Sequence, residues 1–360
     1  MSKSLKIRYY LYPFAWIFGG IAWIRRRLYK AGILKTYQPE IPVVCVGNIA
    51  IGGTGKTPHA GFITRVLSEQ YHVSMLSRGY GRTSKGYILA NTTPMEQLSA
   101  ALIGDEPLQL HERFPSLPLA VAENRKEGIR KLLEYAPDTD VIVMDDAYQH
   151  LSVTPTLRMI LTEYARPYFE DYPMPAGRLR EFPSAVADAD LVVVTKVTDE
   201  MEAIDRDAWR KRLGLRDDQP LFFTRYQYAA PEPVTAAAQN LTLTSDTDID
   251  IILMTGIARS QPLYEHLQTN YHISKHIKYP DHHRYTISEI EQLKKYFGEN
   301  SVLFTTEKDW MRLQGESFKK TLSLLPVFIL PIEIEFLTEE EHQTFIHILK
   351  DHVRRTQKKN

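Results

Sequence analysis

The stretch that decides the fold runs from Val43 to Pro58 and reads VVCVGNIAIGGTGKTP. Its β-branched beginning predicts a buried strand, the glycines predict a turn, and Pro58 suits the first turn of a helix. Strand, glycine-rich turn and helix in this order are the context of a phosphate-binding loop, or P-loop. Because backbone N–H groups can converge there on phosphate oxygens, the stretch predicts an α/β fold that binds a nucleotide.

Residues of the loop have different expected roles. Lys56 supplies a point charge for the β- and γ-phosphates of ATP, and the hydroxyl of Thr57 can bind Mg²⁺. Ala50 stands where the strict pattern G-x-x-x-x-G-K-[ST] has its first glycine, and a glycine turn without function is the alternative. The predicted nucleotide-binding residues are Ala50, Ile51, Gly52, Gly53, Thr54, Gly55, Lys56 and Thr57.

Two neighbouring carboxylates, Asp145 and Asp146, follow a second apolar run at 141–144. A P-loop works with a second strand whose acidic tip holds the metal directly or through water. Aspartate is also common in turns, so a capped strand end is the alternative interpretation. Beside a P-loop, metal binding by at least one of the two, together with Thr57, is the better interpretation.

Candidates for activating an acceptor hydroxyl lie in two distant segments. Asp105 precedes a helix-like stretch in the first half of the chain, where a kinase needs a carboxylate near the γ-phosphate. Asp281 and His282 lie in a loop at 279–285, and a histidine oriented by an aspartate could assist proton removal across a cleft. A metal site on Asp281, His282 and His283 is the minority alternative, because further clusters of such ligands are not found.

Arginines follow several predicted loops, notably Arg78, Arg125 and Arg178. The guanidinium fork binds phosphate bidentately, so these arginines are candidate clamps for a substrate or a transition state. Any one of them alone could instead be a solvated surface charge. The run at 191–196 lacks the Asn and Asp of the guanine-reading motif N-K-x-D, which argues against a GTPase.

The composition is that of a globular protein. The chain has 360 residues, 43% of them hydrophobic, which is enough for two packed cores. Lysine and arginine together number 44 and so do aspartate and glutamate, so no overall field attracts nucleic acid. The single cysteine, Cys45, lies in an apolar run and is expected to be a buried thiol, which excludes a disulfide within the chain.

The first forty residues differ from the rest. The run at 9–24 has no charge and many aromatics, and as a helix it is roughly 24 Å long, short of the about 30 Å hydrocarbon core. Before Pro39 the chain carries eight basic residues and no acidic one. We therefore expect a helix in the membrane interface, with a cleaved signal, a short span or a core helix as alternatives.

A second α/β pattern follows the first. It lies between two extended segments, 221–228 and 325–336, which predicts a small domain on a two-stranded hinge that closes over the nucleotide. The predicted fold class is α/β, a P-loop NTPase-like αβα sandwich with a second, smaller α/β domain. The predicted divisions are an N-terminal region at 1–38, a P-loop domain at 39–222, a smaller domain at 223–336 and a C-terminal helix at 337–360.

The motifs, taken in order, resemble the tetraacyldisaccharide 4′-kinase family of lipid A biosynthesis. They span most of the chain, and their joint order is more specific than any one of them. The matching pieces are 46–48 with 52–58, Ser77-Arg78-Gly79-Tyr80, Gly104-Asp105-Glu106-Pro107, 145–150, Gly177-Arg178-Leu179-Arg180-Glu181, Asp281-His282-His283 and Thr306-Glu307-Lys308-Asp309.

The resemblance implies transfer of the γ-phosphate of ATP, with Mg²⁺, to the 4′-hydroxyl of a tetraacyldisaccharide 1-phosphate, forming lipid IVA. It implies a peripheral or monotopic protein on the cytoplasmic face of the bacterial inner membrane, and no protein or nucleic-acid partner is predicted. The implied site residues are Asp105, His282, Asp281 and Lys56 for catalysis, Thr57, Asp145 and Asp146 for the metal, and Arg78, Glu106, Arg125, Gln149, His150 and Arg178 for the substrate.

A different class of function is the main rival. A membrane-associated P-loop NTPase acting as a switch or assembly factor would explain the loop, the paired aspartates and the N-terminal helix. It would leave Asp105 and the pair Asp281 and His282 without a role. Labelled lipid formed from ATP distinguishes the kinase from the switch.

Overall fold

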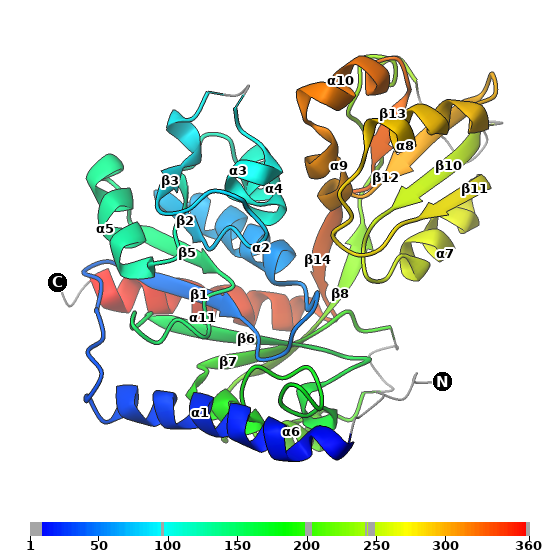
Figure 1. Ribbon diagram of the computed structural model, residues 1–360. Helices are drawn as coiled ribbons and strands as arrows, with labels where there is room; N and C mark the ends of the chain where they lie inside the picture. The colour runs from blue at the N-terminus through cyan, green and yellow to red at the C-terminus, as the bar shows by residue number, and fades with distance from the viewer. Residues whose placement is uncertain (1–8, 95–96, 199–203, 242, 244–248, 358–360) are drawn as a thin grey trace.

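The computed structural model describes residues 9–94, 97–198, 204–241, 243 and 249–357. The described chain forms two α/β units, each built on its own sheet, which lie side by side in Figure 1. One sheet has nine strands and the other has five. The predicted fold class, with a large P-loop unit and a smaller α/β unit, is therefore confirmed.

The large sheet is centred on β1 (Val43–Gly47), which pairs in parallel with β5 (Val141–Asp145) and β6 (Leu157–Glu163). Its central strands are buried throughout, because helices cover both faces. The strand order is β14-β8-β7-β6-β1-β5-β2-β4-β3, and the remaining strands are β2 (Val73–Ser77), β3 (Ile88–Leu89), β4 (Leu119–Val121), β7 (Leu191–Thr195), β8 (Leu221–Tyr228) and β14 (Ile332–Phe336).

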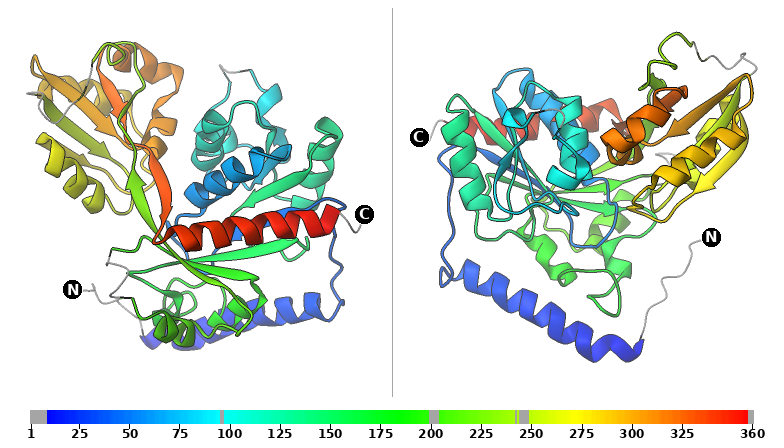
Figure 2. Two further views of the ribbon diagram at one scale, coloured as in Figure 1. Left: turned by 180° about the vertical axis from the view of Figure 1, so that it is seen from behind. Right: turned by 45° about the horizontal axis from the view of Figure 1, so that its top comes forward.

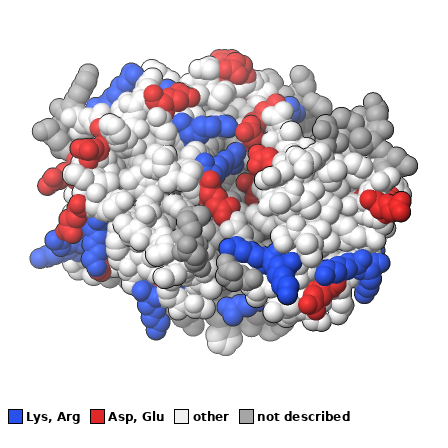
Figure 3. All heavy atoms as spheres, turned by 90° about the horizontal axis from the view of Figure 1, so that it is seen from above, with Lys and Arg blue, Asp and Glu red and all other residues white. Residues whose placement is uncertain are grey.

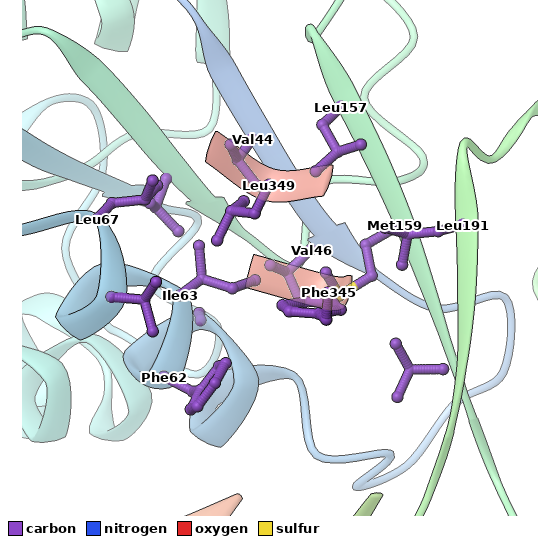
Figure 4. Packing of buried hydrophobic residues seen from close by; sticks show 14 of the residues in the cluster. Val44, Val46, Phe62, Ile63, Leu67, Leu157, Met159, Leu191, Phe345 and Leu349 are labelled. Atoms are coloured by element: carbon purple, nitrogen blue, oxygen red, sulfur yellow. The ribbon is translucent and has the colours of Figure 1, made fainter. Parts of the chain in front are cut away.

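Helices pack on both faces of this sheet. On one face, side chains of α2 (Lys56–Ser68) and α11 (Glu339–Gln357) meet the valines of β1, as the close view in Figure 4 shows. On the other face, α5 (Arg125–Tyr135) packs on β1 and β5, and α6 (Arg206–Leu213) packs on β7. Cys45 is buried, as expected. Shorter elements of this unit are η1 (Tyr9–Leu11), η2 (Ala90–Thr92), α3 (Ala100–Ile103), α4 (Asp105–Arg113), η3 (Tyr168–Glu170) and η4 (Pro183–Asp188).

The small unit has its own core. Its sheet order is β11-β10-β12-β13-β9, and apolar side chains from β10 (Asp250–Thr255) and β12 (Ser301–Thr305) fill both faces. The other elements are β9 (Glu232–Pro233), α7 (Gln261–Asn270), β11 (His272–Lys278), α8 (Ile287–Gln292), η6 (Leu293–Tyr296), α9 (Glu307–Leu313), α10 (Glu316–Leu322) and β13 (Val327–Ile329).

Two antiparallel strands connect the units. β8 and β14 pair from Ile332 opposite Tyr228 to Phe336 opposite Thr224, and together they extend between the large sheet and the small unit (Figures 1 and 2). The extended segment expected at 325–336 is divided into β13 and β14, because Pro331 between them has no N–H to donate to a ladder. The chain thus leaves for the small unit and returns from it along one narrow ribbon.

The N-terminal helix α1 (Tyr12–Lys30) lies along the outer side of the large unit, away from the small one (Figures 1 and 2). Arg26 fixes it there, because its buried guanidinium donates to both oxygens of Glu181, at 2.7 and 2.9 Å, and to Asp188 at 3.0 Å. Among the described residues, no helix combines the length and the apolar character that crossing a bilayer requires.

Candidate active site

The P-loop joins β1 to α2, as predicted. Gly55 is the residue before the helix and has a φ of 90°, and a Cβ added there would lie 2.7 Å from the hydroxyl oxygen of Tyr226. Only glycine satisfies both constraints. The loop is braced from within, because the amide of Asn48 donates to the hydroxyl of Thr54 at 2.8 Å. The backbone N–H groups that open α2 are thereby held ready for phosphate oxygens.

Thr57 and Asp145 meet where Mg²⁺ would bind. The hydroxyl of Thr57 donates to Asp145 Oδ2 at 3.0 Å, while Oδ1 of Asp145 is buried without a hydrogen-bond partner. Burial, reinforced by the nearby charge of Glu106, raises the pKa of Asp145. A hard cation beside the carboxylate would satisfy the orphaned oxygen and reverse this shift, so the donor set fits Mg²⁺.

Asp146 and Lys56 form the next layer of the site. Lys56 Nζ lies 3.6 Å from Asp146 Oδ1, and the guanidinium of Arg180 lies 3.3 Å from the same oxygen. Burial alone would raise the pKa of Asp146, but the charges of Lys56 and Arg180 outweigh it and lower the pKa. Asp146 has a φ of 48°, a left-handed conformation that non-glycine residues rarely adopt and that is often found at functional sites.

Asp105 begins α4 and meets the small unit. Its carboxylate is only 7% exposed, and its Oδ2 accepts from Arg312 Nε at 3.0 Å and Nη2 at 2.5 Å, with His282 Nδ1 at 3.3 Å. Burial would raise the pKa of Asp105, but the hydrogen bond from His282 and the charges of Lys308 and Arg312 hold it well below its usual range. Asp105 is therefore a carboxylate anion gripped by cations of the other unit.

His282 is held in a defined orientation. Its φ is 57°, its N–H donates to the carbonyl of Gly256 at 3.2 Å, and Lys308 Nζ lies 3.3 Å from Nε2. One neutral tautomer, with the proton on Nδ1, donates to Asp105 and accepts from Lys308 at once. Asp281, predicted to orient this ring, lies 4.0 Å from Nε2 and is thus a more distant partner than Asp105.

Ion pairs join the units on two flanks of the P-loop. On one flank, Lys308 donates to Glu106 at 3.1 Å, beside the cluster at Asp105. On the other, Glu163 at the end of β6 lies 3.4 Å from Arg259 of the small unit and accepts from Lys196 at 2.7 Å. Seen from above, acidic and basic side chains gather in the furrow between the units (Figure 3). The small unit therefore contacts the large unit on both sides of the P-loop.

The predicted substrate residues are distributed unequally around the site. Arg125 is 1% exposed at the start of α5, and its Nε and Nη2 have no partner, which suits an anion. Burial and the charges of Arg125 and Arg78 lower the pKa of His150 to about 3, so this histidine is neutral. Gln149 donates to the carbonyl of Asn48 at 2.7 Å. Glu106, as shown above, pairs with Lys308.

Arg180, to which the sequence assigned no role, lies beside the aspartate pair, and the predicted Arg178 does not. Arg178 donates to the buried carboxylate of Asp171 at 2.8 Å, away from the aspartate pair, while Arg180 reaches Asp146 and donates to Gln149 at 3.1 Å. The reason is main-chain pairing, since the N–H of Arg180 donates to the carbonyl of Ile49 at 2.7 Å. Residues two apart share a face in a regular strand, so it is this pairing with the P-loop, and not strand alternation, that brings Arg180 to the aspartate pair.

The second histidine of the predicted loop has a separate partner. His283 contacts Glu289 at 3.0 Å and stacks on Tyr279, with ring centroids 4.4 Å apart. Within the part of the chain that the structure describes, no group of three or more His, Cys, Asp or Glu side chains could hold a metal ion. The alternative of a metal site on Asp281, His282 and His283 therefore has no support in the described residues, and His282 rather than His283 faces Asp105.

Four cations of the site received no role from the sequence. Arg180 and Lys308 stand in matching motifs without a role of their own, and Lys196 ends the run at 191–196. Arg312 had no signal, because its partner Asp105 is 207 residues away. Position after a buried strand was the usable signal for Lys196, which follows β7 directly.

The fold and the site together define a P-loop enzyme that positions a hydroxyl acceptor against a bound nucleotide. The sequence matches the family described as LpxK, tetraacyldisaccharide-1-P 4′-kinase, over residues 7–353. The tetraacyldisaccharide 4′-kinase of Bacteroides thetaiotaomicron is 40% identical over 358 residues, covering 96% of this chain and 93% of the relative. That of Phocaeicola vulgatus is 37% identical over 362 residues, covering 98% and 97%.

A solved structure agrees with these sequence relatives. The crystal structure of an "apo" form of LpxK from Aquifex aeolicus in complex with ATP aligns with a TM-score of 0.72 and 25% sequence identity, covering 95% of this chain and 99% of that one. The chain belongs to the tetraacyldisaccharide 4′-kinase family, which confirms the resemblance drawn from its motifs. It is accordingly an ATP-dependent, Mg²⁺-using kinase of lipid A biosynthesis.

Proposed function

We propose that this chain transfers the γ-phosphate of ATP to the 4′-hydroxyl of a tetraacyldisaccharide 1-phosphate in the furrow between its two units, forming lipid IVA. The observation that carries the proposal is the meeting of Asp105 and His282, which come from different units, on the side of the P-loop. A switch or assembly factor needs no such pair. A kinase does, because the acceptor hydroxyl must be held in line with the phosphate.

At the nucleotide end, the P-loop backbone and Lys56 bind the phosphates. Lys56 exchanges its contact with Asp146 for phosphate oxygens, and Arg180 then neutralises Asp146 in its place. Thr57 and Asp145, with Asp146 nearby, would hold Mg²⁺, which when bound neutralises charge on the phosphate oxygens. These side chains are fixed before substrate arrives, so little reorganisation accompanies the transfer.

At the acceptor end, Asp105 orients the hydroxyl and takes its proton late, with His282 as its partner. Phosphoryl transfer has a loose transition state in which the acceptor proton is lost late, so a strongly basic group is not required. This agrees with the lowered pKa of Asp105, which its charged neighbours impose against the effect of burial. Positioning, rather than basicity, is then the main contribution of Asp105.

The lipid headgroup is recognised by the residues around Arg125. Its unpaired buried nitrogens supply donors for an anionic or hydroxylated sugar, and Arg78 adds a second cation nearby. The neutral ring of His150 and the amide of Gln149 suit sugar hydroxyls. Arg178, being paired with Asp171, supports the loop in this arrangement rather than the sugar.

The two units act as domains that close over the nucleotide, with the β8 and β14 ribbon as the hinge and boundaries near 39–222 and 223–336. The ion pairs from Glu106 to Lys308 and from Glu163 to Arg259 join the domains when closed and separate when they open. Water exclusion on closure suppresses hydrolysis of ATP. Identical solution scattering profiles with and without a non-hydrolysable ATP analogue would contradict closure.

Helix α1 attaches the enzyme to the cytoplasmic face of the inner membrane. Its outward side exposes large apolar residues, among them Phe14, Ile17 and Ile21, each more than 60% exposed. Tryptophans and basic residues flank this apolar side, as in helices that lie in a headgroup layer. A charge placed on that side, as in Ile21→Asp, should release the protein from anionic vesicles in a sedimentation assay while leaving its unfolding temperature unchanged.

The first test is transfer of labelled γ-phosphate from ATP to a tetraacyldisaccharide 1-phosphate in detergent micelles. Wild type should form labelled lipid, Lys56→Ala and Asp105→Ala should not, and Lys131→Ala on the exposed face of α5 should behave as wild type. ATP hydrolysis without labelled lipid would favour the switch or assembly factor instead.

A further inference from the structure

The segment from Thr306 to Asp309 belongs to a matching motif, yet the reaction described above uses only Lys308 of it. Asp309 is completely buried, and its Oδ2 accepts the hydroxyl of Thr306 at 2.7 Å and the N–H of Gly256 at 2.9 Å. Its Oδ1 lies 2.9 Å from Arg312 Nη1. A buried carboxylate with this many hydrogen bonds is a rigid anchor, because together they restrict the rotation of its side chain.

Arg312 is the group that Asp309 anchors. Its Nη1 also donates to the carbonyl of Gly256 at 3.1 Å, and the same carbonyl accepts the N–H of His282. Arg312 and His282 are therefore held at one main-chain atom and both reach Oδ2 of Asp105. The position requires glycine at 256, because an added Cβ would lie 2.8 Å from Asp309 Oδ1 and from the hydroxyl of Tyr285.

We propose that Arg312, anchored by Asp309, is a positioning residue for phosphoryl transfer. Its guanidinium joins the small unit to the carboxylate of Asp105 and holds that carboxylate beside His282. The inference rests on the proposed function, in which Asp105 orients the acceptor. Arginine suits the task because its rigid fork places donors on Asp105 and on the anchor at the same time. A lysine has a single nitrogen, so it cannot reproduce the two separated donors of the fork.

Removing Arg312 would leave Asp105 buried with weaker partners. Because burial penalises the anion, loss of the guanidinium should raise the pKa of Asp105, and the acid limb of the pH profile should move to higher pH. If Arg312 only stabilised the fold, its removal would instead lower the fraction of active enzyme equally at every pH. The charged or titratable groups that face Asp105 are Arg312 and Lys308 from α9, His282 and, behind it, Asp281 from the preceding loop, and Glu106 from its own helix.

The test compares Arg312→Ala, Arg312→Lys and the control Arg259→Ala, which removes the ion pair on the other flank without touching Asp105. Arg312→Ala should lower kcat about 10- to 100-fold with KM for ATP changed less than about threefold, and shift the acid limb upward. Arg312→Lys should recover part of kcat, and added guanidinium at millimolar concentration should do so for Arg312→Ala. Arg259→Ala should leave the acid limb where it is in wild type.

Two outcomes would overturn the inference. One is a uniform loss of rate in Arg312→Ala with an unmoved acid limb and no recovery by guanidinium or lysine. The other is a carbon NMR titration in which the carboxyl of Asp105 responds to pH alike in wild type and Arg312→Ala, or alike in wild type and the neutral variant Arg312→Gln should Arg312→Ala not fold. This titration needs no turnover, so it separates failure of the inference from failure of the proposed function.

Discussion

The two ends of the reaction site are built in different ways. At the nucleotide end, Gly55, Lys56 and Thr57 are consecutive, and their partners Asp145 and Asp146 end the neighbouring strand. At the acceptor end, Asp105 belongs to the large unit, while His282 and Arg312 belong to the small one. The first end lies within the large unit, whereas the second is formed by residues of both units. The residues that bind the nucleotide and the residues that hold the acceptor are therefore separated in space.

Replacing Lys56 tests the end that is built within one unit. Lys56→Met should lower kcat about 10³-fold, because the loss of a preorganised cation at the transferring group is the largest single loss that the site can suffer. Steady-state transfer of labelled phosphate measures it. Scattering profiles with the nucleotide analogue should still show closure, and a variant that no longer closes would contradict the independence of the two ends.

Replacing Asp105 tests the assembled end. Asp105→Asn should lower kcat about 10²-fold while leaving the binding of an ATP analogue within about threefold of wild type, since the change removes an acceptor contact and not a phosphate contact. Isothermal titration calorimetry with the analogue measures the second quantity. A large loss of nucleotide affinity would mean that Asp105 also contributes to nucleotide binding and that the two ends of the site are not independent.

Gly55 probes the backbone of the nucleotide end. Gly55→Ala imposes a side chain at a φ of 90° and against the hydroxyl of Tyr226, so nucleotide should bind about tenfold more weakly and the free energy of unfolding should fall by about 1–3 kcal/mol. Gly20→Ala, where an added Cβ meets nothing within 4 Å, is the matched control and should leave nucleotide binding unchanged. Fluorescent nucleotide titration and thermal unfolding measure the two effects.

The pH dependence of Mg²⁺ binding gives the smallest effect. The folded pKa of Asp145 is raised by burial, so in the absence of metal this group costs stability as pH rises above its unfolded value of about 3.9. Mg²⁺ displaces the proton, so its affinity with bound ADP should increase severalfold between about pH 6 and about pH 8. In Asp145→Asn the increase should be absent. An unchanged slope in that variant would assign the metal to Asp146 alone.

The same contrast explains what the sequence could predict. The P-loop, its strand and its helix could be predicted because their contacts are local, and the aspartate pair because it ends an apolar run. Arg180 could not be distinguished from Arg178, because the pairing of 177–181 with the P-loop decides which side chain faces the site. Arg312 could not be predicted at all, because only the tertiary fold brings it to Asp105, 207 residues away in the chain.

Under the proposed attachment to the membrane, the docking of α1 would determine how high the site stands above the bilayer. Arg26 packs over the ring of Tyr148 at 4.9 Å, and Arg25 donates to the carbonyl of Gln149 at 3.2 Å. Tyr148 and Gln149, the two residues that α1 contacts here, come directly after Asp145, Asp146 and Ala147 in the chain. If α1 lies in the headgroup layer, as proposed, the helix would be a fixed spacer between the lipid surface and the metal site. A sugar that is still rooted in the membrane by its acyl chains is then met at one depth, and molecules free in solution gain nothing from that geometry.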